Sequence, residues 1–253
     1  MAISSLVLSC PHLRSLDVSD NNIRDPGIIE LAHGLAACKH LQQLKLQYNY
    51  ISAAGAEAVC STMRSLQHLR TIDLRHNSVQ MAGAFALAEA ISSCCHLQIL
   101  SLSRNHIQPN GAMAIVRALM ASCNHLKQLK LDKNNLNQDV CAVVSKCLRS
   151  CPHLRQLDLS DNPLGDQGAM HIGALLPSLP NLQLLDLSHT KMGNPGAYAI
   201  AQGVSHCAYL QELHLSHNHI ANEGVVRLTV SLNNCMHIRI LSLSNNSIST
   251  GSR

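Results

Sequence analysis

Aromatic residues are almost missing from this sequence. The 253 residues include no Trp, one Phe and four Tyr, although hydrophobic residues make up 46% of the chain. The core must therefore be aliphatic. Because few bulky side chains are available, we expect it to consist of many small equivalent layers rather than one large interior. The length is sufficient for one large domain or two small ones.

Charge and long apolar runs are also scarce. Charged residues make up 13% of the chain and the net charge is +4, which is too small to indicate nucleic-acid binding by itself. No apolar run approaches the roughly eighteen residues that a membrane-spanning helix requires. The opening segment, MAISSLVLSCPHL, has neither a basic region nor a small-residue cleavage site, so we expect no secretory signal.

Cysteine is plentiful, but its pattern does not indicate a disulfide framework. The eleven cysteines are an odd number, in a chain far longer than a typical disulfide-stapled mini-domain. We therefore expect reduced thiols and a cytoplasmic protein.

The dominant feature of the sequence is a repeat. The pattern L-x-x-L-x-L-x-x-N recurs every 28 residues, with one interval of 29, from Leu13, Leu41, Leu69, Leu97, Leu126, Leu154, Leu182, Leu210 and Ile238. Thr190 alone replaces the Asn. In the first eight repeats, a Gly comes six residues after the Asn position, with Val140 as the one exception. This regularity predicts a solenoid of stacked units.

Each unit is expected to form a strand, a loop and a helix. The alternating leucines have the period of a strand, and apolar residues four and eight positions after the Gly form one face of a helix. Asp25, Asp166 and Asn194 suit helix N-termini. The Asn amide is expected to satisfy backbone groups at the end of each strand. Since strands pack closer together than helices do, we predict a curved α/β horseshoe with a parallel sheet on its concave face and helices on its convex face.

Units such as LQLLDLSHTKMGNPGAYAIAQGV resemble the ribonuclease-inhibitor-like leucine-rich repeats, and most of all the repeat arrays of NOD-like receptors. The resemblance covers the whole chain and implies a single leucine-rich repeat domain over residues 1–253, with about eight full repeats and a partial one at each end. It also implies a ligand-binding or autoinhibitory module. The chain has no GxxxxGK[ST] motif, so the nucleotide-binding domain of those receptors is not expected here. The helical pattern at Ile3 and Val7, and the end after the ninth strand, suggest a segment of a longer protein or a short repeat-only product.

A C-x-H column suggests zinc at first sight. It comprises Cys10/His12, Cys38/His40, Cys94/His96, Cys123/His125, Cys151/His153 and Cys235/His237. Successive members lie one repeat apart, however, which is too far for a zinc ion that holds sulfur at about 2.3 Å. Buried thiols at the turn between helix and strand explain the column better, and we expect no metal and no cofactor.

Catalysis is not expected either. Asp17, Asp73, Asp158 and Asp186 share the central exposed strand position, and neighbouring carboxylates can raise one another's pKa. This position lies on an open surface without a pocket to exclude water. We therefore expect no enzyme and no small-molecule substrate.

The variable strand positions predict a binding surface. In repeats two to five they carry seven basic and two acidic residues, a net charge of +5, whereas repeats six to eight carry one basic and four acidic residues, a net charge of −3. Tyr48 and Tyr50 lie beside the basic part, and Tyr and Arg are common in interface hot spots. We predict a concave partner-binding surface formed by Lys45, Tyr48, Tyr50, Arg75, His76, Arg104, Lys130 and Lys133. A solvated charged face that only keeps the protein soluble is the alternative.

The predicted function is protein–protein interaction, in the sensing or autoinhibitory region of an innate immune protein similar to NOD-like receptors, or in a repeat-only relative. The partner is expected to be a protein with an acidic surface, not a nucleic acid or a membrane. A GTPase activator resembling the Ran GTPase activators is the alternative, although the acidic stretch of those proteins is not found here. Actin capping, as in tropomodulin-like arrays, has no supporting motif.

Overall fold

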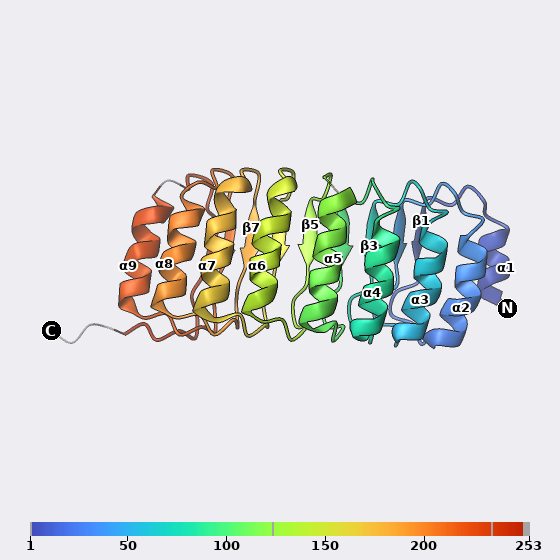
Figure 1. Ribbon diagram of the computed structural model, residues 1–253, viewed down its shortest axis with the longest axis horizontal. Coiled ribbons are helices and arrows are strands. Elements are labelled where there is room, and N and C mark those ends of the chain that lie inside the picture. Colours follow the sequence, from blue (N-terminus) through green and yellow to red (C-terminus); the bar gives the residue numbers. More distant parts are fainter. Residues whose placement is uncertain (1, 123, 234, 250–253) are drawn as a thin grey trace. The chain divides into compact units, whose positions relative to one another are not determined.

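The computed structural model describes residues 2–122, 124–233 and 235–249. The chain divides into two compact units, Met1–Asn134 and Asn135–Arg253. In each unit, strands alternate with helices along the chain, and the helices lie side by side on one face of the strands (Figure 1). The fold class is thus the predicted α/β repeat solenoid. Within the described residues, no helix combines the length and the apolar composition needed to cross a bilayer.

The first unit contains five parallel strands that pair in chain order. Leu16, Leu44, Ile72, Leu100 and Leu129 stand opposite one another in successive strands. The strands are β1 (Ser15–Asp17), β2 (Gln43–Lys45), β3 (Thr71–Asp73), β4 (Ile99–Ser101) and β5 (Gln128–Lys130). The helices are α1 (Ala2–Leu8), α2 (Arg24–Leu35), α3 (Ala53–Met63), α4 (Gln80–Ile91) and α5 (Gln108–Ser122).

The second unit repeats this arrangement. Its strands are β6 (Gln156–Asp158), β7 (Leu184–Asp186), β8 (Glu212–His214) and β9 (Ile240–Ser242), again parallel and in chain order. Its helices are α6 (Gln138–Cys147), α7 (Gly165–Leu175), α8 (Asn194–Val204) and α9 (Asn222–Leu232), and the 3₁₀ turns η1 (Leu148–Ser150) and η2 (Leu176–Ser178) follow α6 and α7.

The repeated leucines form the core of each unit. Leu41, Leu44 and Leu46 of the second repeat are all fully buried. Val59 and Met63 of α3 are buried at the spacing of one helical face. Because each repeat contributes the same small layer, the core needs no aromatic side chain, as the composition predicted.

The Asn column forms the predicted ladder. Asn77 Nδ2 donates to the carbonyls of Leu46, Leu74 and Arg75 at 3.0, 2.9 and 3.3 Å. Its Oδ1 accepts the amides of Asn49 and Ile51 at 3.0 and 2.9 Å. One buried side chain thus satisfies five backbone groups in two repeats, where the chain leaves the sheet.

Thr190 interrupts the ladder in the second unit. Its hydroxyl donates to the Leu187 carbonyl at 2.8 Å and lies 3.1 Å from Asn218 Oδ1. The Thr190 side chain is too short to form the hydrogen bonds that a ladder Asn makes with backbone groups of the preceding repeat. The Leu164 amide donates instead to the Asn162 carbonyl two residues before it, at 2.8 Å.

The polar residues in the first turn of a helix cap the next helix along the chain and not their own. Asp25 lies in the first turn of α2, but its Oδ1 accepts the amide of Ser52, the residue that caps α3, at 2.8 Å. Asp166 in α7 likewise accepts the amides of Gly193 and Gly196 at 2.8 and 2.9 Å. Their predicted position at helix N-termini is confirmed, and each carboxylate stabilises the start of the next helix.

This close approach accounts for several members of the Gly column. A Cβ added to Gly55 would meet the Asp25 carboxylate, and one added to Gly224 would lie 2.8 Å from Asn194 Oδ1. Neither glycine has a positive φ angle. These glycines are therefore required by the lack of space between neighbouring helix starts rather than by backbone conformation.

The Cys column is explained by packing. Cys38, Cys94, Cys151, Cys207 and Cys235 are buried. The Cys235 thiol donates to the Val204 carbonyl of the preceding helix at 3.2 Å, and the Cys207 thiol donates to the Leu176 carbonyl at 3.5 Å. Cys10 is exposed, and Cys123 lies outside the described residues.

Candidate partner-binding surface

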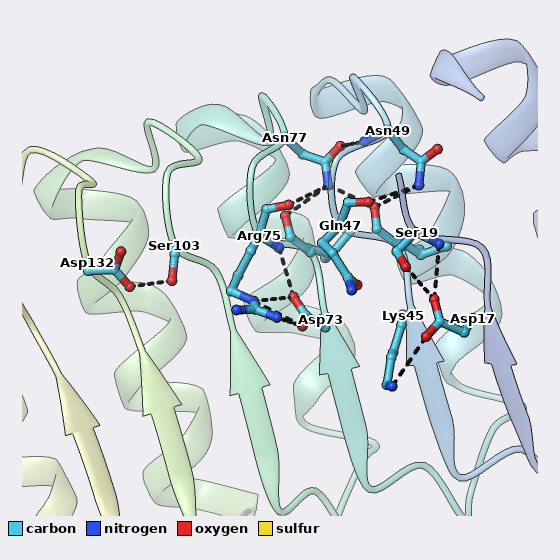
Figure 2. A network of polar contacts seen from close by, with 12 residues as sticks. Asp17, Ser19, Lys45, Gln47, Asn49, Asp73, Arg75, Asn77, Ser103 and Asp132 are labelled. Carbon is cyan, nitrogen blue, oxygen red and sulfur yellow. Dashed lines mark hydrogen bonds and ion pairs between the residues drawn. The ribbon is translucent and has the colours of Figure 1, made fainter. Parts of the chain in front are cut away.

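The strands of the first unit leave one face free of helices, and polar side chains cover it (Figure 2). In β2, Leu44 is buried, whereas Gln43 is exposed and Lys45 is half-buried. The same alternation in β5 leaves Lys130 half-buried on this face. The period of two along each strand therefore places Lys45 and Lys130 where the sequence predicted them.

Two of the predicted cations on this face form ion pairs. Lys45 Nζ lies 3.3 Å from Asp17 Oδ2 on the neighbouring strand. Arg75 Nη2 lies 2.6 Å from Asp73 Oδ2, and its Nε also donates to this carboxylate at 2.9 and 3.0 Å. The hydrogen bonds to Asp73 raise the pKa of Arg75. The positive charge available to a partner is therefore concentrated on the other basic residues.

The Asp column has a structural role that the sequence analysis missed. Asp17 and Asp158 each accept the amide of the serine two residues later at 3.1 Å, and Asp186 accepts that of Ser188 at 2.9 Å. Asp73 accepts the amide of Arg75 in the same way. These carboxylates fix the turn that leaves the strand, and this gives a reason for the column other than catalysis.

A row of side chains lies at the edge of the sheet, directly before the ladder asparagines. We call Tyr48, His76, Arg104 and Lys133 the rim row. All four have left-handed backbone conformations, with φ angles of 57°, 54°, 56° and 52°. This conformation is uncommon for such residues, and the ladder hydrogen bonds on both sides impose it here. Identical backbone geometry in successive repeats places the four side chains in register.

Tyr48 and His76 form an aromatic platform in the rim row. Their ring centroids are 4.0 Å apart and their planes are inclined by 18°. Burial lowers the pKa of His76, and the positive charges of Arg104 and Arg75 lower it further. His76 is therefore held in its neutral form near neutral pH, where it stacks without repelling the neighbouring cations.

A groove of about 860 Å³ lies beside this platform. Loops of four successive repeats line it, so its long direction runs across the strands. Its residues include Asp20, Arg24, Tyr48, Tyr50, His76 and Arg104. Tyr50 is 71% exposed and Tyr48 is 47% exposed. The groove is open and contains both charged and aromatic groups, which suits recognition of a polymer segment rather than enclosure of a small molecule.

Only some residues of the predicted binding surface line the groove. It unites Tyr48, Tyr50, His76 and Arg104, whereas Lys45, Arg75, Lys130 and Lys133 are not among its residues. Sequence reasoning missed Asp20 and Arg24, which come from the first repeat. Asp20 occupies the same repeat position as Tyr48, a signal that could have identified it.

The second unit has a related stacked pair at its rim and acidic residues on its strands. His189 and His217 stack with centroids 3.8 Å apart, at the same repeat position as Tyr48 and His76. Here His214 Nε2 lies 3.2 Å from Glu212 Oε2. Asp158 stands opposite Asp186 in adjacent strands. The strands of the second unit thus carry the acidic residues that give its variable positions their negative net charge.

The His members of the C-x-H column are separated from the thiols. His12, His40 and His68 are exposed. The rings of His40 and His68 stack with centroids 6.0 Å apart, and the His12 ring lies 5.8 Å from that of His40 at a tilt of 30°. Cys38, by contrast, is fully buried. No group of three or more His, Cys, Asp or Glu side chains within the described residues is arranged to hold a metal ion.

Comparison with known proteins agrees with this repeat geometry. The family described as Leucine Rich repeat matches residues 9–32, 37–60, 65–88, 93–116, 150–173, 178–201 and 206–228. The chain belongs to the leucine-rich repeat family. Such repeats generally form non-enzymatic, protein-binding scaffolds. A comparison with curated protein sequences gives no significant match.

Solved structures share the fold of this leucine-rich repeat protein. The ectodomain of the Arabidopsis receptor kinase HAESA, in complex with an N-terminally extended IDA peptide hormone, is similar with a TM-score of 0.61 and 20% identity. The match covers 94% of this chain and 35% of that one, so this chain spans about a third of the ectodomain. The C-terminal domain of tropomodulin from Caenorhabditis elegans is similar with a TM-score of 0.50 and 12% identity, over 58% of this chain and 92% of that one. At these identities the likeness concerns the fold alone.

Proposed function

We propose that this protein is a non-enzymatic interaction module that binds an acidic protein partner through residues 1–134. The contact surface comprises Lys45, Tyr48, Tyr50, Arg75, His76, Arg104, Lys130 and Lys133. The observation that carries the proposal is the groove beside the Tyr48–His76 platform, which Arg104 and two exposed tyrosines line together. Aromatic rings provide contact area, and complementary charge speeds association and selects the partner.

The cellular role proposed is that of a cytoplasmic sensing or autoinhibitory region, similar to the arrays of NOD-like receptors. Two observations support it: the similarity of the repeat units to those arrays, and the ten free cysteines among the described residues, which suit a reducing compartment. The HAESA ectodomain, which shares the fold, was solved with a peptide ligand, and this supports a protein or peptide as the bound species.

Affinity purification from cytosol tests the proposal. The wild-type protein and a Tyr48→Ala/Arg104→Glu variant are used as baits, and the captured proteins are compared by mass spectrometry. We expect a protein with an acidic surface that the wild type captures and the variant does not. Single-turnover GTP hydrolysis by Ran, with and without the protein, tests the alternative: we expect equal rates, and acceleration would favour the GTPase activator.

A further inference from the structure

The groove beside the Tyr48–His76 platform has a cation at each end. Arg24 is the first residue of α2 in the first repeat, Arg104 lies in the loop after β4 in the fourth, and both line the groove. Neighbouring parallel strands are about 4.8 Å apart. Three such spacings separate the two arginines by roughly 14 Å in the direction across the strands.

The groups along the groove are available to a ligand. Arg24 donates through its Nε to Asn22 Oδ1 at 2.9 Å, and no hydrogen bond among the described residues engages its terminal nitrogens. No hydrogen bond within the described part of the chain engages the guanidinium of Arg104 or the hydroxyls of Tyr48 and Tyr50. Between the cations lie the exposed rings of Tyr48 and Tyr50.

This spacing matches an extended peptide. Residues i, i+2 and i+4 of a strand point to the same side, and each residue advances about 3.3 Å, so side chains i and i+4 are about 13 Å apart. Two carboxylates at these positions would reach Arg24 and Arg104. The side chain at i+2 would lie on the aromatic rings between them.

We propose that the groove binds an extended acidic peptide with two carboxylate side chains four residues apart and a flat apolar side chain midway between them. The inference rests on the proposed function, because it specifies the segment of the partner that the surface recognises. Arg24 and Arg104 each form charge-assisted hydrogen bonds with one carboxylate. The central side chain packs on Tyr48 and Tyr50.

The groove favours a peptide over a nucleic acid because it also contains a carboxylate. Asp20 lines the groove at the end where Arg24 lies, and it would repel the regularly spaced phosphates of a single strand. Sequence-independent binding of single strands relies on a continuous positive track. A peptide can place a neutral residue opposite Asp20.

The test uses the full chain and synthetic peptides with fluorescein at the N-terminus and an amide at the C-terminus, measured by fluorescence anisotropy. The probe is GESFSEG. One control, GQSFSQG, removes both charges, and a second, GESFESG, places the acids three residues apart. We expect GESFSEG to bind at least about tenfold more tightly than either control. GQSFSQG lacks the carboxylates that form the charge-assisted hydrogen bonds, and GESFESG places them too close together to reach both arginines.

Variants locate the site. Arg24→Gln and Arg104→Gln should each weaken GESFSEG binding about fivefold or more, whereas Arg117→Gln, on an exposed position of α5, should leave it unchanged. Asp20→Asn should strengthen binding about twofold, because it removes the repelling carboxylate. A gain of affinity cannot result from misfolding, so this variant keeps the test decisive if an arginine variant is unstable.

Several outcomes would overturn the inference. The first is that the three peptides bind equally tightly. The second is that Arg117→Gln and Arg104→Gln lower the affinity for GESFSEG equally. The third is that a fluorescein-labelled decauridylate binds more tightly than GESFSEG and that its binding depends on Arg24. If capture of a cytosolic partner requires Tyr48 and Arg104 but GESFSEG does not bind, this inference is wrong and the proposed function stands. If GESFSEG binds as expected but no Tyr48-dependent partner is captured, the peptide specificity stands and the proposed function fails.

Discussion

Tyr48 and His76 are 28 residues apart in the sequence, yet their rings stack with centroids 4.0 Å apart. The contact follows from the repeat, because both residues directly precede a ladder asparagine and share a left-handed backbone conformation. The repeat therefore turns two distant residues into one aromatic surface. Two arginines, Arg24 and Arg104, line the same groove.

Removing the polar cap between helices should destabilise the first unit. Asp25→Ala deprives the Ser52 amide and hydroxyl of their acceptor, and loss of a helix cap costs about 1–2 kcal/mol. Asp25→Asn should cost less, because Asn194 accepts amides in the same way in the second unit. Urea denaturation measures both.

Glu57→Ala, an exposed change on α3, is the matched control for this cap and should have little effect. If Asp25→Ala and Glu57→Ala lower the free energy of unfolding equally, the cap between repeats does not contribute as described.

Restoring the interrupted ladder should stabilise the second unit. Thr190→Asn supplies an amide that can donate to the Leu159 carbonyl and accept the Leu164 amide, as Asn77 does for its neighbours. The gain should be about 1 kcal/mol or less, because Thr190 already donates to Leu187. Thr190→Ser keeps only the hydroxyl and should give no gain. Destabilisation by Thr190→Asn of more than about 1 kcal/mol would refute the ladder argument at this repeat.

Zinc should not be required for folding. A thiol must lose its proton to bind zinc, and desolvation by burial raises the pKa of Cys94 to about 11 and that of Cys207 to about 12. Both thiols therefore remain protonated at neutral pH. We expect circular dichroism to be unchanged by EDTA. A mole of zinc per chain in elemental analysis, lost together with the fold, would show that the C-x-H column binds metal after all.

We propose that residues 1–253 behave as one repeat domain. Stability in repeat proteins is close to a sum of repeat terms and of terms between neighbours, and neighbouring repeats that are strongly coupled unfold together. Phe85→Trp on α4 and Tyr209→Trp in the second unit provide one fluorescent probe in each unit. Coincident urea midpoints are expected, and two separate midpoints would indicate two domains.

Much of the fold could be predicted from the sequence because each feature recurs many times. The alternating leucines determine the strands, and the Asn column indicates the ladder. The partner of Asp25 could not be found in this way, because nothing local to Asp25 shows that its carboxylate reaches the start of the next helix. The left-handed backbone conformation of Tyr48 could not be predicted either, since Tyr has no preference for positive φ angles.

The candidate site was predictable only in part. His76, Arg104 and Lys133 share one repeat position, so their alignment follows from the repeat. Tyr48 and Tyr50 were predicted because Tyr is common in interface hot spots. The pairing of Arg75 with Asp73 makes Arg75 less available to a partner. Arg75 follows the end of β3 by two residues, and this short spacing could have revealed the pair. Arg24 follows its ladder asparagine rather than preceding it, and only the structure places it in the groove.

The most direct test of the central claim measures the affinity of the partner, once captured, for three forms of the protein by isothermal titration calorimetry. Tyr48→Ala combined with Arg104→Glu should raise the Kd at least about tenfold, because it removes an anchor ring and reverses a charge in the groove. Asp186→Ala, in the second unit, should change the Kd much less. Equal effects of the two variants, or no effect of either, would contradict the placement of the binding surface on residues 1–134.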